Sequence, residues 1–303
     1  MTQLLPLFLD NLLPIFLIAG VGYLLGKTLH IEPRSVSQII FFALSPCLLF
    51  DILANNGMSG GDMLLMTSLA AVVLLSVGLL TWLAGSLLRL ERKLLAAVTM
   101  TAMLPNAGNL GLSVVLFAFG EKAVSYASLY FVASVIVSYT AGIFVASSGS
   151  LSPWKSFVNL FKVPMIYSVV LALLFHQFSW TLPVPLERSV SLLGQATIPM
   201  MILLLGLQFQ HAGGKFPISA IALAAGMRLL VSPAIGYSLS LASNLQGSAM
   251  QAFVLESSVP SAVTSTMLAT QYDVEPSFVA KVVFMTTLLS PLTITPILAF
   301  LGA

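Results

Sequence analysis

One uncharged run, residues 94–120, constrains the chain more than any other feature, because it is long enough to cross the apolar core of a bilayer. Its centre, residues 104–111, contains one proline, two glycines and two asparagines. A proline inside a helix removes a backbone hydrogen bond and leaves a carbonyl unpaired. In hydrocarbon, such a break is tolerated only where protein or a water-filled cavity surrounds it. The run therefore predicts a broken membrane helix at a polar binding site.

A second stretch with the same character, residues 256–262, lies in the other half of the chain around Pro260. Where a helix ends it presents bare carbonyls, and where it restarts it presents unpaired N–H groups with partial positive charge. Two crossed breaks would offer N–H ends to a carboxylate and carbonyl ends to a proton or Na+. We interpret the pair as a transport site. The simpler alternative is that both prolines only kink their helices.

The composition places the whole chain in a membrane. Of its 303 residues, 58% are hydrophobic and 7% are charged, whereas charged residues make up about a quarter of a soluble domain. The long apolar stretches lack the alternation of an outer-membrane barrel, so the spans are expected to be helices. A net charge of +2 gives no reason to expect nucleic acid as a partner. The expected partners are membrane lipids and a small substrate.

Ten apolar spans account for nearly all of the sequence. They are predicted near residues 12–29, 35–54, 63–88, 94–119, 123–145, 163–178, 189–210, 217–241, 247–270 and 277–301. The Ser-rich stretch 148–162 is predicted to be a cytoplasmic linker between two domains, residues 1–147 and 163–303.

Basic residues predict the orientation. Eight of them, namely Lys27, Arg34, Arg89, Arg92, Lys93, Lys155, Lys162 and Lys215, follow the odd-numbered spans, against two, Lys122 and Arg188, on the opposite side. Cytoplasmic loops are enriched in Lys and Arg, so both termini are expected on the non-cytoplasmic side. The expected location is the cell membrane, in a bacterium the inner membrane.

The two halves of the chain also resemble each other. The tetrapeptide Arg-Ser-Val-Ser occurs at 34–37 and again at 188–191, each followed by a proline, Pro46 and Pro199. The intervals from these prolines to Pro105 and Pro260 are 59 and 61 residues. Because each half has five spans, an odd number, the second copy enters the membrane the other way up. The predicted fold is all-α, with ten transmembrane helices in two inverted five-helix repeats and with helices four and nine broken and crossed.

Glu256 is the most informative single residue, since a lone carboxylate near the bilayer centre costs several kcal/mol when unpaired. It needs a partner or a proton. One interpretation makes it the residue that exchanges H+ or coordinates Na+ for coupling, with Asn109 as a further ion ligand. The alternative, a structural ion pair with Arg228 or Lys281, is equally compatible with the sequence.

The remaining candidates are polar or helix-breaking residues beside the two prolines or inside other spans. The substrate-binding candidates are Pro105, Asn106, Gly108, Asn109, Gln208, Arg228, Ser257, Ser258, Pro260, Ser261 and Thr264. Serine and threonine hydroxyls also bond back to their own helix, so each is weak evidence alone. The histidine spacing predicts no metal site, apart from the Na+ considered at Glu256. The sequence has no Walker loop and no His-Glu-x-x-His motif, so we expect neither a catalytic residue nor an enzyme.

Several segments resemble the auxin efflux carrier family. The match to its fourth span lies at 109–112 and 119–123, and Leu-Gly-Leu-Gln at 205–208 is similar to its seventh-span signature. The most specific likeness is to its last two spans, at 256–263, 268–273 and 288–296. The resemblance covers nearly the whole chain and implies the crossed ten-helix fold, which is also found in the related bile acid and sodium symporters.

This resemblance also implies a function. Plant members export indole-3-acetic acid, and bacterial members are associated with malate, malonate and related carboxylates. Asn106 matches the family asparagine that contacts the substrate carboxylate, and Glu256 stands where the bile acid symporters bind sodium. We therefore expect a secondary transporter of small organic carboxylate anions, with no cofactor, with H+ or Na+ as the coupling ion, and with a homodimer as its assembly. The alternative is a membrane ligand sensor built on a transporter fold.

Overall fold

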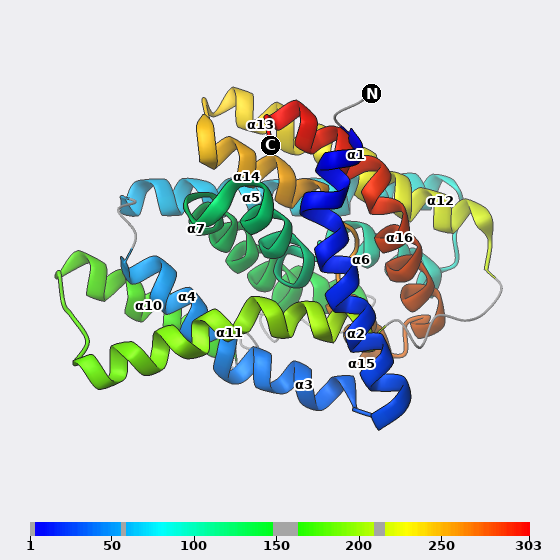
Figure 1. Ribbon diagram of the computed structural model, residues 1–303. Helices are drawn as coiled ribbons and strands as arrows, with labels where there is room; N and C mark the ends of the chain where they lie inside the picture. Colours follow the sequence, from blue (N-terminus) through cyan, green and yellow to red (C-terminus); the bar gives the residue numbers. More distant parts are fainter. Residues whose placement is uncertain (1–3, 56–58, 148–162, 209–215) are drawn as a thin grey trace.

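The computed structural model describes residues 4–55, 59–147, 163–208 and 216–303, which form a bundle of packed helices (Figure 1). In chain order the elements, with π-helical turns labelled η, are α1 (Leu4–Leu7), η1 (Phe8–Leu12), α2 (Leu13–Leu29), α3 (Pro33–Ile39), η2 (Ile40–Leu44), α4 (Ser45–Asn55), α5 (Gly60–Leu87), α6 (Arg92–Met103), η3 (Ala107–Leu112), α7 (Ser113–Val137), η4 (Ser138–Gly142), α8 (Ile143–Ala146), α10 (Pro164–Gln177), α11 (Val184–Gln208), α12 (Ile218–Gly226), η6 (Met227–Val231), α13 (Ser232–Ala242), α14 (Gly247–Ser258), α15 (Thr264–Tyr272) and α16 (Pro276–Leu301).

Seven helical stretches in the described part of the chain are long and apolar enough to cross a membrane. They are Leu4–Leu29, Pro33–Asn55, Gly60–Leu87, Ala107–Ala146, Val184–Gln208, Ile218–Ala242 and Pro276–Leu301. Many of their leucines point outward; Leu64, for example, is 72% exposed. Outward leucines on helices of this length suit a lipid environment. The all-α membrane class is therefore confirmed, and the chain is a multi-pass membrane protein.

The stretch Ala107–Ala146 includes a break at Gly120. Gly120 has φ 74° and ψ −176°, a backbone conformation that residues with a Cβ rarely adopt. The chain therefore changes direction there, between the predicted fourth and fifth spans. The predicted linker 148–162 and the end of the seventh predicted span lie outside the described residues, as do Lys155, Lys162 and Lys215.

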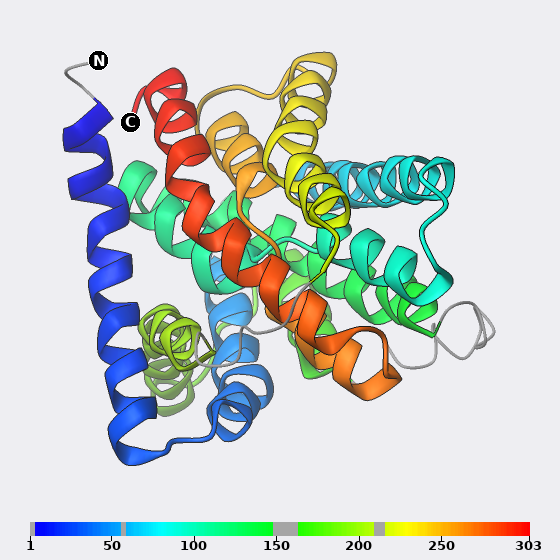
Figure 2. The ribbon, with the colours of Figure 1, turned by 90° about the vertical axis from the view of Figure 1, so that its right-hand side faces the viewer.

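The helices pack in two groups (Figures 1 and 2). In the first, α2 and α4 pack against α11, and α10 packs against α4. In the second, α5, α6, α7, α13 and α14 pack against one another. Helix α1 contacts α16, so the two ends of the described chain lie at the same end of the bundle (Figure 2). The two groups meet where α4 contacts α7 and where α11 contacts η3, the turn that precedes α7.

Two glycines allow α2 and α11 to pack backbone to backbone. A Cβ built on Gly206 would lie 2.7 Å from the Ala19 carbonyl carbon and 2.7 Å from the Tyr23 amide nitrogen. A Cβ built on Gly22 would lie 2.9 Å from the Leu203 carbonyl carbon. Backbone atoms cannot rotate away as a side chain can, so only glycine fits at these two positions.

We therefore expect Gly206→Ala to lower the melting temperature of the detergent-solubilised protein, because α2 and α11 must move apart. Overpacking of this kind costs about 1–3 kcal/mol. Gly20→Ala is the matched control, since no atom lies within 4 Å of a Cβ built at that position of α2. Equal melting temperatures for the two variants would contradict the close approach.

Candidate functional site

Both predicted breaks are present in the structure. Helix α6 ends at Met103, and Leu104 is extended, with φ −93° and ψ 111°. Helix α14 ends at Ser258, and Val259 is extended, with φ −68° and ψ 153°. In each case the chain crosses a short extended segment and then resumes helical conformation, in η3 and α15 respectively. A proline lies inside each segment. Because proline has no backbone N–H, a helix that continued through it would miss a hydrogen bond.

The two extended segments cross and bond to each other. Pro105 and Ser261 form an isolated antiparallel bridge. The Asn106 amide donates to the Pro260 carbonyl, and the Ala262 amide donates to the Leu104 carbonyl, each over 2.8 Å. The crossing thus pairs backbone groups that hydrocarbon would otherwise leave unsatisfied. It also brings together residues about 150 positions apart in the sequence.

A cavity of about 340 Å³ lies on one side of the crossing, which we call the crossing cavity. Its wall includes six of the predicted site residues: Pro105, Asn106, Gly108, Asn109, Gln208 and Thr264. Asn106 is almost fully buried, and its side-chain nitrogen has no hydrogen-bond partner among the described residues. The N-terminal turn of η3 begins beside it, and such a turn has N–H groups without partners in the helix. Unpaired donors on a cavity wall suit an anion.

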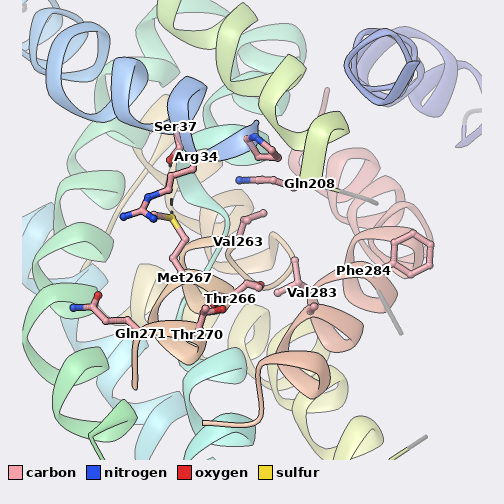
Figure 3. Close-up of a pocket in the computed structure, with 12 residues that line it drawn as sticks. Arg34, Ser37, Gln208, Val263, Thr266, Met267, Thr270, Gln271, Val283 and Phe284 are labelled. Atoms are coloured by element: carbon pink, nitrogen blue, oxygen red, sulfur yellow. Dashed lines mark hydrogen bonds between the residues drawn. The ribbon is translucent and has the colours of Figure 1, made fainter. Parts of the chain in front are cut away.

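A second cavity of about 540 Å³ adjoins the first and shares part of its wall; we call it the outer cavity (Figure 3). The shared residues are Arg34, Ser37, Gln208, Val263 and Met267. They come from α3, the end of α11 and the start of the α15 region (Figure 3). The Ser37 hydroxyl contacts the Met267 sulfur over 4.0 Å, which links α3 to α15. Arg34 adds a positive charge to both cavities.

Sequence reasoning missed several residues of the crossing cavity. Arg34 was assigned to a loop and, with Ser37, to the internal repeat, but neither was placed at the site. Four further residues of the wall were not singled out: Phe131, Ser134, Ser138 and Tyr139. Ser134 and Ser138 are four residues apart, so they lie on one face of the same helical stretch. Two hydroxyls four residues apart in the otherwise apolar fifth span are the sequence feature that points to these cavity residues.

Glu256 does not line the crossing cavity; it is fully buried in the last turns of α14. Neither carboxylate oxygen has a hydrogen-bond partner among the described residues. The carboxylate lies against Gly111, where an added Cβ would be 2.6 Å from the carboxylate carbon. Gly111 belongs to η3, so Glu256 lies against the helical turn that follows the first break. In the described chain no direct ion pair joins it to Arg228, although the Arg228 guanidinium lies within electrostatic range of the carboxylate. The alternative of a structural pair with Arg228 or Lys281 stays a prediction.

Arg228 is also fully buried and is not part of the crossing cavity wall. It stands in the π-helical turn η6 between α12 and α13. Its guanidinium donates to the Ala102 carbonyl over 3.3 Å, and also to the Ser257 carbonyl and the Ser232 hydroxyl. The Tyr130 hydroxyl lies within electrostatic range of the guanidinium. Tyr130 stacks edge-on against Phe253, with ring centroids 5.5 Å apart, and sequence reasoning did not single it out.

The serines of the second break differ in their surroundings. The Ser257 and Ser258 hydroxyls donate to carbonyls of their own helix, at Phe253 and Val254, over 2.8 and 2.6 Å. Both hydroxyls are therefore satisfied by carbonyls of their own helix, as is common for serine in membrane helices. The Ser261 amide donates to the Thr286 hydroxyl over 3.2 Å, whereas the Ser261 hydroxyl is buried without a partner among the described residues.

One exposed ion pair joins the outer ends of the two broken helices. The Lys93 ammonium lies 2.8 Å from an oxygen of Asp273, between the start of α6 and the residue after α15. This hydrogen bond lowers the pKa of Asp273 below its usual value. Both side chains are well exposed, so the pair adds little stability. In the described ranges, no three His, Cys, Asp or Glu side chains cluster as a metal site would need.

The fold and the crossing define a multi-pass membrane protein with a polar site buried between broken helices. Comparison with known proteins identifies its class. The model of the membrane transport protein family matches residues 7–153 and 150–298, so the chain belongs to this family, that of the auxin efflux carriers. The chain is a membrane transporter.

Relatives with names point the same way. An "Uncharacterized transporter" of Methanocaldococcus jannaschii is 27% identical over 297 residues, covering 94% of this chain and 96% of the relative. A "Putative malonate transporter" of Rhizobium meliloti is 25% identical, covering 94% and 93%. Auxin efflux carrier component 3a of rice is 28% identical over 146 residues, covering 45% of this chain and 23% of the relative.

Proposed function

We propose that this chain is a secondary transporter of small organic carboxylate anions that works by alternating access. The observation that carries the proposal is the crossing of the two breaks beside a cavity whose wall holds the Asn106 side-chain amide nitrogen, which has no partner among the described residues. A carboxylate accepts hydrogen bonds from such an amide and from the N–H groups of the η3 turn. The names of two relatives, one for malonate and one for auxin, are consistent with this substrate class.

We place the substrate at Asn106, Asn109, Pro105, Gly108, Gln208 and Thr264, which all line the crossing cavity. Pro260 and Ser261 support the site from the other break through the backbone bridge. Glu256 is the proposed coupling residue, because its two free oxygens offer a place for a H+ or a Na+. Ser257, Ser258 and Arg228 support the crossing rather than contact the substrate.

The proposed architecture is ten spans in two inverted five-helix repeats, residues 1–147 and 163–303, with both termini on the non-cytoplasmic side of the cell membrane. The tetrapeptide Arg-Ser-Val-Ser at 34–37 and again at 188–191 supports a duplication. The two breaks have the same order of elements, helix, extended segment and helix. The division of the helices into two packing groups supports movement of the group with the crossing against the group with α2, α4, α10 and α11.

Counterflow in proteoliposomes tests the transport proposal. Vesicles loaded with unlabelled malonate should accumulate labelled malonate from outside, because a carrier exchanges substrate across a sealed membrane. A ligand sensor on the same fold would bind the label without accumulating it. Empty vesicles give the background, and a panel of mono- and dicarboxylates covers the substrate class. If no carboxylate exchanges while one of them raises the melting temperature, the sensor alternative holds instead.

A further inference from the structure

Arg228 lies where two helices end. The Ala102 carbonyl is near the C-terminus of α6, and the Ser257 carbonyl is near the C-terminus of α14. The last four carbonyls of a helix have no partner within the helix. The guanidinium of Arg228 reaches one such carbonyl from each broken helix, and the Ser232 hydroxyl also donates to the Ser257 carbonyl, over 2.8 Å.

Both carbonyls lose their ordinary helical partner because of the crossing. The amide of Asn106, four residues after Ala102, donates instead to the Pro260 carbonyl. The amide of Ser261, four residues after Ser257, donates instead to the Thr286 hydroxyl. Each carbonyl is therefore left for another donor, and the same arginine supplies it. A single side chain from η6 joins the two half-helices on the carbonyl side of the crossing.

The positive charge of Arg228 suits the two helix ends that it contacts. A helix C-terminus carries a partial negative charge, and two of them converge here inside the protein. A cation stabilises such an arrangement, and the carbonyl ends of broken helices are where transporters hold Na+. Guanidinium stays charged when buried, and its planar fork of donors reaches separate carbonyls at once.

We propose that Arg228 is a built-in cation of the crossing, which neutralises the carbonyl ends of both half-helices so that no Na+ is needed there. Arg228 is a positioning residue, since it holds the two breaks in place and lines neither cavity. A covalently attached charge cannot be exchanged across the membrane. The coupling part of this inference rests on the proposed transport function: with the carbonyl ends occupied, the carboxylate of Glu256 exchanges H+, not Na+. The Arg228 guanidinium and the Tyr130 hydroxyl face this carboxylate within electrostatic range.

Thermal unfolding of the full-length protein in detergent tests the built-in cation without any transport assay. The wild type should melt within about 1 °C in NaCl, KCl and choline chloride at equal ionic strength, because a ligand that does not bind does not stabilise. Arg228→Ser removes the cation and leaves the carbonyls free, so its melting temperature should be lower in choline chloride and should recover by several degrees in NaCl. Arg188→Ser is the matched control, since Arg188 is exposed at the start of α11.

Arg228→Lys keeps the positive charge, so its melting temperature should not respond to Na+. If arginine acted only by filling space, the lysine variant would respond to Na+ as Arg228→Ser does. A wild type stabilised by Na+ but not by choline would overturn the proposal. So would an Arg228→Ser variant as stable as Arg188→Ser and indifferent to Na+. If Arg228→Ser fails to fold, the wild type and Arg228→Lys still decide the question.

The transport assay separates this inference from the proposed function. Wild-type counterflow should be unchanged when choline replaces Na+ on both sides of the vesicles. Counterflow that requires Na+ would overturn the coupling part of the inference and leave the carboxylate transporter intact. Absence of counterflow with every carboxylate would overturn the transporter and leave the thermal test of Arg228 unaffected.

Discussion

The Asn106→Ala variant is expected to transport the carboxylate with an apparent affinity about 30-fold lower than that of the wild type, and with a lower maximal rate. The Asn106 side chain is the buried donor on the wall of the crossing cavity, and it has no other partner in the described chain. A hydrogen bond to a charged group contributes about 2 kcal/mol, and each 1.4 kcal/mol is about tenfold in affinity. The backbone bridge survives the substitution, so the variant should still insert and fold.

The control for this variant is Asn11→Ala. Asn11 is also nearly buried, and it lines neither cavity. Its side-chain amide already donates to the Leu7 carbonyl of its own helical stretch, over 3.0 Å. Initial rates of carboxylate uptake over a range of concentrations, with membrane amounts matched by immunoblot, measure both variants. Wild-type kinetics in Asn106→Ala would show that the carboxylate binds elsewhere.

Glu256→Gln should abolish the response of transport to a pH gradient while leaving exchange at equal pH measurable. The carboxylate is fully buried and neither oxygen is paired within the described chain, so it is the group best placed to take up and release a proton. Glutamine has nearly the same shape and cannot titrate. The measurement is the ratio of uptake with an imposed pH gradient to uptake without one. This ratio should fall from several-fold in the wild type to about one in Glu256→Gln.

The same variant makes a separate prediction about stability. An unpaired buried charge costs several kcal/mol, whereas a neutral amide of the same size costs much less. The melting temperature of Glu256→Gln should therefore equal or exceed that of the wild type. Glu187→Gln, at an exposed carboxylate at the start of α11, is the control. A gradient response that persists in Glu256→Gln would assign the coupling to another residue, and a large loss of stability would show that the carboxylate has a structural partner.

The membrane class and the two breaks could be predicted because both are local properties of the sequence. A long uncharged run is apolar whatever surrounds it, and a proline removes an N–H wherever it stands. The ends of α6 and α14 accordingly lie within two residues of Pro105 and Pro260. Asn106 and Asn109 were placed at the site for the same reason, as residues beside a break.

The partners of the polar side chains could not be predicted in this way. Helical spacing tells which residues share a face, but not which face turns inward or which helix lies opposite. Ser257 and Ser258 stood beside the break yet bond back to their own helix, whereas Tyr130, in an apolar stretch of α7, faces Arg228. Arg34 was counted as a loop charge and forms part of both cavity walls.

The membrane class and the two broken helices follow from the amino-acid sequence alone, because hydrophobicity and the missing N–H of proline act at each position whatever packs around it. The packed structure was needed to show that Arg228 donates to carbonyls at the ends of both broken helices and that Glu256 lies against Gly111. Ala102 lies 126 residues from Arg228 in the sequence, and Ser257 lies 29 residues from it. The geometry of these contacts depends on how whole helices rotate and cross when they pack.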